Sequence, residues 1–447
     1  METRLFSNRK IVAMIVPLVI EQGLTNFVGM CDGMMVSSVG EAAISGVSLV
    51  DMINAVVLTL FAALAVGGAV VTSQFLGAKN MDKAQQSAGH LVLMAGGLGI
   101  GAMAVCLVFA EGLMHLFFGS VDDAVMEAGL IYLRITAVSF PFIALYNAGA
   151  AVFRSVGNSK ISMQVSILMN VINVCGNALC VYGLKMGVAG VAVPTLVSRA
   201  VAAVLILVLA SNPRNELHIT KEGFLHFDGG MMKNILRIGV PNACENSFFQ
   251  FGRLIVASMI ALFGTMQTSA NAVANTLDSI GIIAGQAMSL AIVTVVGQCV
   301  GARDNRQVVY YVKKLIGWSY LMMGVCNLLI LLFVNQLIGL YSGLSPETVA
   351  LARSLVVLHC SFAILMWPVA FVLPSALRAA NDVKFTMWVG VGSMLVFRVF
   401  GSWLLCVQME MGAMGVWIAM ILDWVCRIAF YLPRMISGKW KSKYRPT

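Results

Sequence analysis

Long apolar stretches separated by short polar connections dominate the sequence. Six lie near residues 11–37, 43–76, 84–110, 124–153, 161–184 and 188–210, and six more near 234–262, 268–300, 308–338, 346–377, 384–406 and 413–436. Each is long enough to cross a bilayer as a helix, which needs about 20 mostly apolar residues. Because the stretches are continuously apolar rather than alternating, a membrane β-barrel is excluded. The pattern predicts an all-α integral membrane protein with twelve transmembrane helices.

Sequence signals at helix starts refine two of these boundaries. We expect Asp82 to cap the third helix, because its side chain can accept a hydrogen bond from an unpaired backbone N–H. Ser345 followed by Pro346 is typical of an N-cap with proline at the first helical position.

The chain repeats itself at an offset of 224 residues, close to half of its 447. With six spans in each half, both halves have the same orientation, so we expect two six-helix lobes related by pseudo-two-fold symmetry. The expected lobes are residues 1–210 and 234–447, joined by a cytoplasmic linker at 211–233. Repeat-related pairs include Pro17 and Pro241, Glu21 and Glu245, Gly77 and Gly301, and Arg154 and Arg378.

Composition and charge exclude a soluble enzyme. Of the residues, 59% are hydrophobic and 11% are charged, against roughly 25% charged in soluble domains. The net charge is +9, and 22 of the 29 Lys and Arg lie in loops on one side of the predicted spans. This asymmetry predicts a multi-pass plasma (inner) membrane protein with both termini in the cytoplasm, and it explains the basic charge without nucleic acid. Cys and His show no zinc-ligand spacing, so we expect no cofactor and no metal other than Na⁺ as one of two candidate coupling ions, H⁺ being the other.

Ionisable side chains within spans indicate where transport chemistry lies, because each costs about 2.5–3.5 kcal/mol at the bilayer centre. Glu21 and Asp32 are 11 residues apart on the first span, which places both carboxylates on one helix face. Asp32 is the principal candidate for ion or proton coupling. For Glu21, a coupling role and a structural role are equally open. Pro17 removes a backbone donor and allows this helix to bend.

Polar side chains on other spans extend the candidate site. Asn170, Asn173 and Asn177 share one face of the fifth span, where amide oxygens suit Na⁺, and Thr195 on the sixth span offers a further oxygen. Asp51 with Asn54 and Asn275 with Asp278 are i,i+3 pairs at repeat-equivalent positions. These pairs predict a shared aqueous substrate cavity, with polar packing between helices as the alternative. The residues expected at the cavity are Asp51, Asn54, Asn170, Glu245, Arg253, Asn271, Asn275 and Asp278.

Arginines within spans have two predicted roles. Asp423 and Arg427 have the i,i+4 spacing of a helical ion pair, and Arg398 is expected to join them in a structural ion cluster. Arg253 lies two turns after Glu245 and is expected to be its counter-ion. Because of these arginines, an anionic substrate remains an alternative.

A set of short segments recurs in the same order along both halves. The segments are Val16-Pro17 with Asp32, SSVGEAAISGVSL (37–49), SQFLGAKN (73–80), FRSVGNSK (153–160), Asn173 with Asn177, GVAGVAVPT (187–195), IGVP (238–241), GQCVGARDN (297–305) and LRAANDVK (377–384). In order, spacing and duplication they resemble the multidrug and toxic compound extrusion (MATE) family, over essentially the whole chain.

The resemblance implies two lobes around a V-shaped cavity and export of drugs or metabolites in exchange for Na⁺ or H⁺. It also implies a cation site made by Asp32, Asn173, Asn177 and Thr195, in which Asn177 replaces an acid, so that Asp32 carries most of the coupling.

We therefore predict a secondary antiporter, not an enzyme. It is expected to export amphipathic, cationic organic compounds in exchange for inward H⁺ or Na⁺ by alternating access. An exporter of an endogenous metabolite or of an anionic or lipid-linked compound is the alternative, and a non-transporting membrane sensor or scaffold is an alternative of another class. The expected partners are a small organic substrate and membrane lipid, and the chain is expected to act as a monomer.

Overall fold

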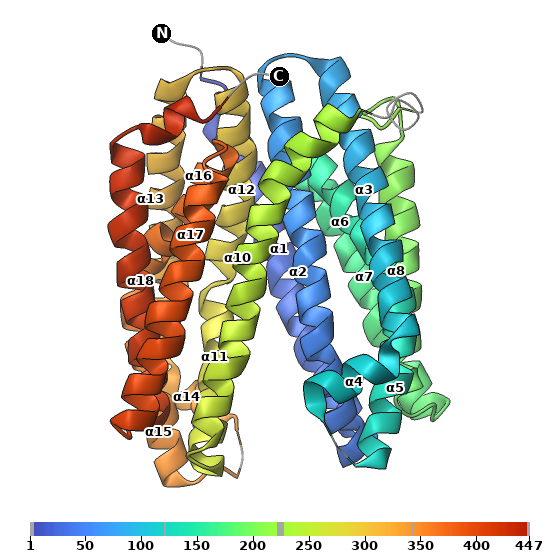
Figure 1. Cartoon of the computed structure of the whole chain (residues 1–447), viewed down its shortest axis with the longest axis vertical. Coiled ribbons are helices and arrows are strands. Elements are labelled where there is room, and N and C mark those ends of the chain that lie inside the picture. Colours follow the sequence, from blue (N-terminus) through green and yellow to red (C-terminus); the bar gives the residue numbers. More distant parts are fainter. Residues whose placement is uncertain (1–3, 120–121, 221–227, 342, 445–447) are drawn as a thin grey trace. The chain divides into compact units, whose positions relative to one another are not determined.

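The computed structural model describes residues 4–119, 122–220, 228–341 and 343–444, which form helices and turns with no strand among them (Figure 1). These helices belong to two compact units. The N-terminal unit is Asn8–Ala243, and the C-terminal unit runs from Cys244 onward and includes the short segment before Asn8.

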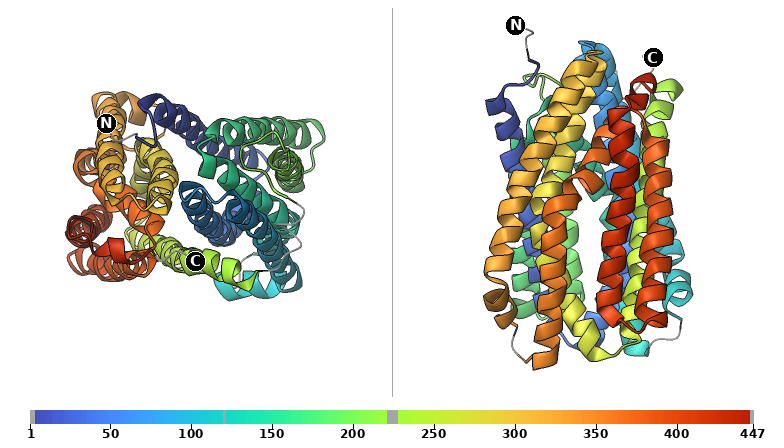
Figure 2. Two further views of the ribbon diagram at one scale, coloured as in Figure 1. Left: turned by 90° about the horizontal axis from the view of Figure 1, so that it is seen from above. Right: turned by 90° about the vertical axis from the view of Figure 1, so that its left-hand side faces the viewer.

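The N-terminal unit contains the first six predicted spans. Its longest helices run side by side, and they are coloured blue to green in Figures 1 and 2. Its elements are α1 (Asn8–Ser37), α2 (Glu41–Gly77), α3 (Met81–Val108), α4 (Ala110–Phe118), α5 (Asp123–Val138), α6 (Phe140–Val156), α7 (Ser159–Ala178), the π-helical turn η1 (Leu179–Gly183) and α8 (Ala189–Ala210).

The C-terminal unit contains the other six predicted spans, the first of them only in part. Its first helix, α10 (Gly229–Ala261), begins in the N-terminal unit and belongs to the C-terminal unit from Cys244. The following elements are α11 (Thr265–Gly281), α12 (Ile283–Gly301), α13 (Asn305–Leu332), α14 (Val334–Gly339), α15 (Pro346–Trp367), η2 (Pro368–Val372), α16 (Leu373–Ala379), α17 (Val383–Ser393), η3 (Met394–Phe400), η4 (Trp403–Gln408), α18 (Gly412–Ile436) and the 3₁₀ turn η5 (Lys439–Ser442).

All twelve predicted apolar segments are helical. Within the described residues, ten helices are long and apolar enough to cross a membrane, and the bent pair α5–α6 makes an eleventh. The remaining predicted segment is α10, which carries Lys233, Arg237, Glu245 and Arg253 and is therefore less apolar. It also begins at Gly229, inside the expected linker, of which residues 221–227 lie outside the described residues.

Several spans predicted as continuous helices are interrupted. The segment predicted at 124–153 bends by 44° between α5 and α6, where Pro141 in the first turn of α6 has no N–H to donate. The third span ends at Val108 and is followed by a separate helix, α4, that the apolar pattern did not predict. Phe109 separates α3 from α4, and the repeat-related Phe333 separates α13 from α14 in the same way. The backbone φ angles of these two residues are −105° and −106°.

The turn after the second span of each half carries the same kind of helix cap. Asn80, not Asp82, caps α3, accepting a hydrogen bond from the Lys83 N–H. The repeat-related Asp304 caps α13, accepting from the N–H groups of Arg306 and Gln307. Asp82 lies within the first turn of α3, where it favours the helix dipole instead. The predicted cap at Ser345 is confirmed, because its side chain accepts from the Thr348 N–H.

The two equivalent caps should respond differently to pH. The pKa of Asp304 lies below its ordinary value of 3.8, chiefly because the carboxylate accepts the Gln307 N–H. Its stabilising contribution is therefore present above pH 3.8 and is lost as pH falls through the lowered pKa. We expect Asp304→Ala to cost about 1 kcal/mol at pH 7 and less at pH 3, whereas the cost of Asn80→Ala should not change. Thermal unfolding of the purified protein at both pH values measures this, and equal pH dependence of the two variants would contradict it.

Candidate functional site

Four residues predicted to form the cation site are joined by hydrogen bonds in the N-terminal unit. The amide nitrogen of Asn177 on α7 donates to Asp32 Oδ1 on α1 over 2.7 Å and to Asn173 Oδ1 over 3.3 Å. The Asn173 amide nitrogen donates in turn to Thr195 Oγ1 on α8 over 2.9 Å. Side chains from three helices therefore make one polar chain that ends at a carboxylate, named here the Asp32 network.

The amides of the Asp32 network present nitrogen, not oxygen, to their neighbours. Asn177 is fully buried, and its Oδ1 has no hydrogen-bond partner within the described part of the chain. A Na⁺ site requires several oxygens directed at one point. Here a nitrogen donor already occupies an Asp32 oxygen, while an unpaired acceptor, Asn177 Oδ1, lies in the same network.

Asp51 lies in a second polar group beside this network. It accepts hydrogen bonds from the Asn54 amide, over 3.4 Å, and from the Tyr132 hydroxyl. Arg199, one turn after Thr195 on α8, attracts both Asp32 and Asp51 and donates to Ser139 Oγ over 2.7 Å. Neither Arg199 nor Tyr132 was predicted to belong to the site, although Arg199 lies four residues after Thr195 and therefore near it on the same helix face.

Asn170 lies on the same helix face as Asn173, but its hydrogen bond leads away from the Asp32 network. Its amide nitrogen donates to Ser166 Oγ over 3.4 Å. No hydrogen bond from Asn170 to the Asp32 network is found among the described residues.

Glu21, the second acid of α1, belongs to a separate ion pair. Its carboxylate lies 3.5 Å from Arg154 Nη1 and accepts hydrogen bonds from the hydroxyls of Ser162 and Tyr146 over 3.0 and 3.4 Å. Glu21 is buried and Arg154 is half-buried. The shared helix face therefore does not bring Glu21 and Asp32 into one site. Glu21 contacts α6 and Ser162 near the start of α7, whereas Asp32 contacts Asn177 near the end of α7.

The repeat-related Glu245 in the C-terminal unit has the equivalent partner. Its carboxylate lies 3.1 Å from Arg378 and 3.6 Å from Arg427. The prediction that Arg253 is its counter-ion is wrong, because these two arginines occupy the carboxylate while Arg253 is exposed. The pairing Glu21–Arg154 and Glu245–Arg378 was readable from the repeat, in which all four residues recur at one offset.

Arg427 connects Glu245 to a buried ion cluster. Its Nε lies 3.2 Å from Asp423 Oδ1, and its Nη2 donates to the Gly390 carbonyl over 3.2 Å. Gly390 has no room for a side chain, because a Cβ there would collide with the Glu245 carboxylate. Arg398 lies beside the cluster with its guanidinium 5.7 Å from the Phe249 ring centre. No ion pair within 4.0 Å joins Arg398 to an acid in the described chain, and its Nε is buried without a partner.

A second polar group of the C-terminal unit centres on His359 of α15, which sequence reasoning missed. Its Nε2 lies 2.7 Å from Asp278 Oδ1 on α11, although the angle is not that of a directed hydrogen bond. The imidazole packs edge-on against Trp417 and Trp424 of α18. Trp417 in turn donates to Asn271 Oδ1 over 2.8 Å. Of two predicted cavity residues on α11, Asp278 thus contacts His359, and Asn271 contacts the tryptophan packed against it. The isolated position of His359 in the sequence gave no signal.

The predicted cavity residues are divided between the units. Asp51, Asn54 and Asn170 lie in the N-terminal unit, and Glu245, Arg253, Asn271, Asn275 and Asp278 lie in the C-terminal unit. A cavity that they share remains a prediction. The described residues hold no group of three or more His, Cys, Asp or Glu placed to bind a metal ion.

Comparison with known proteins assigns the chain. The model of the MatE family matches residues 17–179 and 241–404, one segment in each half. The chain belongs to the MatE family. It is therefore a membrane transporter, and both matched segments begin at a repeat-related proline, Pro17 and Pro241.

Relatives along the full length support this assignment. An uncharacterized transporter, YisQ of Bacillus subtilis, is 26% identical over 96% of this chain and 92% of its own. A probable multidrug resistance protein, NorM of Thermotoga maritima, is 24% identical over 97% and 93%. The solved structure of a MOP superfamily transporter from Pyrococcus furiosus, described as having a binding pocket of reverse polarity, superposes with a TM-score of 0.89 at 20% identity, covering 97% of this chain and 96% of that one. The predicted fold class is confirmed.

Removing the arginine should have unequal effects in the two repeat-related pairs. Arg154→Met leaves Glu21 without the Arg154 cation, and breaking a buried pair in this way costs about 3–5 kcal/mol. Arg378→Met leaves Glu245 beside Arg427, so its cost should be smaller. The two arginines are matched controls, since both side chains are 13% exposed.

Thermal unfolding in detergent compares the two variants. Adding Glu21→Gln to Arg154→Met should recover much of the lost stability, because no buried charge then remains unpaired. Equal destabilisation by the two arginine substitutions would show that Arg427 does not share the Glu245 charge.

Proposed function

We propose that this MatE-family transporter is a proton-coupled antiporter that exports amphipathic, cationic organic compounds by alternating access. Its multidrug-resistance relative supports the substrate class. The proposal places the protein in the plasma membrane with both termini in the cytoplasm, and it takes the two repeat-related halves as the moving lobes. The observation that carries it is the Asp32 network.

Donor placement in the network supports H⁺ over Na⁺. The ionised Asp32 carboxylate is stabilised by the Asn177 amide nitrogen at 2.7 Å. On protonation, Asp32 becomes a donor, and the unpaired Asn177 Oδ1 is an acceptor within the same network. Rotation of the Asn177 amide is therefore enough to give a protonated Asp32 a hydrogen-bond acceptor. Na⁺ binding would instead require the oxygens of Asn173, Asn177 and Thr195 to turn toward one point beside Asp32.

Glu21 has a structural role in this proposal. Its charge is balanced by Arg154 and its oxygens accept two hydroxyls, so it holds α1 against α6 and α7. Pro17 is buried one turn before Glu21, where a missing backbone donor lets α1 bend. We place the bend at Pro17, with Asp32 on the part of α1 beyond the Glu21 attachment.

A second candidate is export of an anionic compound. It is favoured by Arg398, whose buried Nε lacks a partner in the described chain while Arg427 is already paired. Under this alternative, organic anions rather than organic cations would compete with the exported substrate.

Replacing Asp32 separates coupling from structure. Asp32→Asn should abolish efflux driven by a pH gradient, because position 32 then cannot take up and release a proton, and the protein should still fold. The matched control is Glu21→Gln combined with Arg154→Met, which removes both charges of the ion pair and should retain gradient-driven efflux. The measurement is dye efflux from proteoliposomes of equal protein content. Wild-type efflux by Asp32→Asn would overturn the proposed coupling site.

Placing an acid at position 177 should change which ion is coupled to transport. Asn177→Asp places a second carboxylate next to Asp32 and removes the amide donor, which makes the network attractive to Na⁺. We expect transport by this variant to depend more steeply on Na⁺ concentration at fixed pH than wild-type transport does. Identical Na⁺ curves would show that position 177 does not determine which ion is used.

A further inference from the structure

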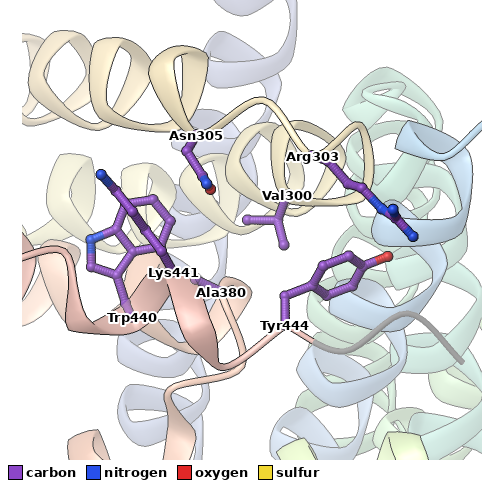
Figure 3. A pocket seen from close by; sticks show the side chains of 7 residues that line it. All are labelled: Val300, Arg303, Asn305, Ala380, Trp440, Lys441 and Tyr444. Atoms are coloured by element: carbon purple, nitrogen blue, oxygen red, sulfur yellow. The ribbon is translucent and has the colours of Figure 1, made fainter.

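A cavity of about 280 Å³ lies where the C-terminal tail packs against two interhelical turns of the C-terminal unit. Arg303 and Asn305 come from the α12–α13 turn, Ala380 from the α16–α17 turn, and Trp440, Lys441 and Tyr444 from the tail. Figure 3 shows Arg303 and Tyr444 on one side of the opening and Lys441 with Trp440 on the other. Three segments distant in sequence therefore build one small site.

The lining is fixed by backbone and aromatic contacts. Arg303 adopts the left-handed conformation with φ of 57°, which residues other than glycine seldom adopt. Trp440 is 2% exposed, and its indole N–H donates to the Met435 carbonyl over 3.1 Å. The Lys441 ammonium lies 5.8 Å from the centre of the Trp440 ring. The tail is thus held in place beside the turn that carries Arg303.

The cavity carries two cations whose neighbouring acids are already engaged. Asp304 caps α13, and Asp382 binds Arg434 through two contacts of 2.6 and 3.1 Å. No acid lies within ion-pair distance of Arg303 or Lys441 among the residues that the structure describes. Arg303 also acts electrostatically on the hydroxyl of the half-buried Tyr444, which counters the rise in the Tyr444 pKa caused by partial burial.

We propose that this cavity binds the phosphate-bearing headgroup of an anionic phospholipid. Two cations and a phenolic hydroxyl suit a phosphate, and the volume lies below the roughly 300 Å³ at which sites for drug-sized ligands begin. The α18 span ends at Ile436, four residues before Trp440. Trp and Tyr at the end of a span lie at headgroup depth, which favours a lipid over a soluble phosphate compound. The inference does not depend on the transported substrate or the coupling ion.

Binding can be measured on the full chain in detergent by native mass spectrometry, titrating phosphatidylglycerol, phosphatidylcholine or inorganic phosphate. The test variant is Arg303→Gln with Lys441→Gln. The matched control is Lys439→Gln with Lys443→Gln, which removes the same charge from exposed positions outside the lining. We expect phosphatidylglycerol affinity to fall roughly 30-fold in the test variant, as for the loss of two cations near a membrane surface, and to change little in the control.

Two further measurements distinguish loss of the binding site from unfolding and from a change in side-chain shape. The melting temperature without lipid shows whether the test variant is folded, and Arg303→Lys with Lys441→Arg should retain binding if charge is what matters. Equal loss in test and control variants would overturn the proposal, because it would reflect general attraction to a basic tail. Phosphatidylglycerol binding no tighter than phosphatidylcholine, with inorganic phosphate bound at the cavity, would overturn the assignment to lipid.

Discussion

The fold depends on neutralising carboxylates inside apolar helices. An unpaired charge at bilayer depth is costly. Each half of this chain therefore pairs a glutamate, one turn after a proline, with an arginine at the end of a later helix. Glu21 and Glu245 are buried, and their partners Arg154 and Arg378 are half-buried. Each pair joins the first helix of its half to a later helix of the same unit.

Asp32 differs from these glutamates in the nature of its partner. An amide nitrogen contacts it, and Arg199 acts on it without an ion pair within 4.0 Å among the described residues. A carboxylate held by an arginine resists protonation, whereas one held by a neutral amide can change its charge. The C-terminal unit has no equivalent, since the positions related to Asp32 and Asn177 are Val256 and Gly401. Arginines therefore hold the two glutamates, whereas neutral donors hold Asp32 and the neighbouring Asp51. The proposal assigns coupling to Asp32.

The sequence was sufficient for the helices but not for their side-chain partners. Apolar length predicted every span because bilayer thickness constrains it directly, and the repeat contained the Glu–Arg pairs. The convergence of Asp32, Asn173, Asn177 and Thr195 came from family resemblance. Arg253 was paired wrongly with Glu245 because spacing along one helix was favoured over contacts between helices. His359, Tyr132 and Trp417 depend on such contacts, which no local pattern encodes, and the helix breaks at Phe109 and Ser139 likewise have weak local signals.

The central claim is that a single protonatable carboxylate couples transport to an ion gradient. The most direct test reconstitutes the wild-type protein in liposomes containing a pH-sensitive dye and imposes H⁺ and Na⁺ gradients separately, with organic cation on the side from which it is exported. The account predicts that the H⁺ gradient alone drives substrate exchange with matching proton movement, and that the Na⁺ gradient alone does not. Substrate exchange driven by Na⁺ at constant pH, without proton movement, would contradict it.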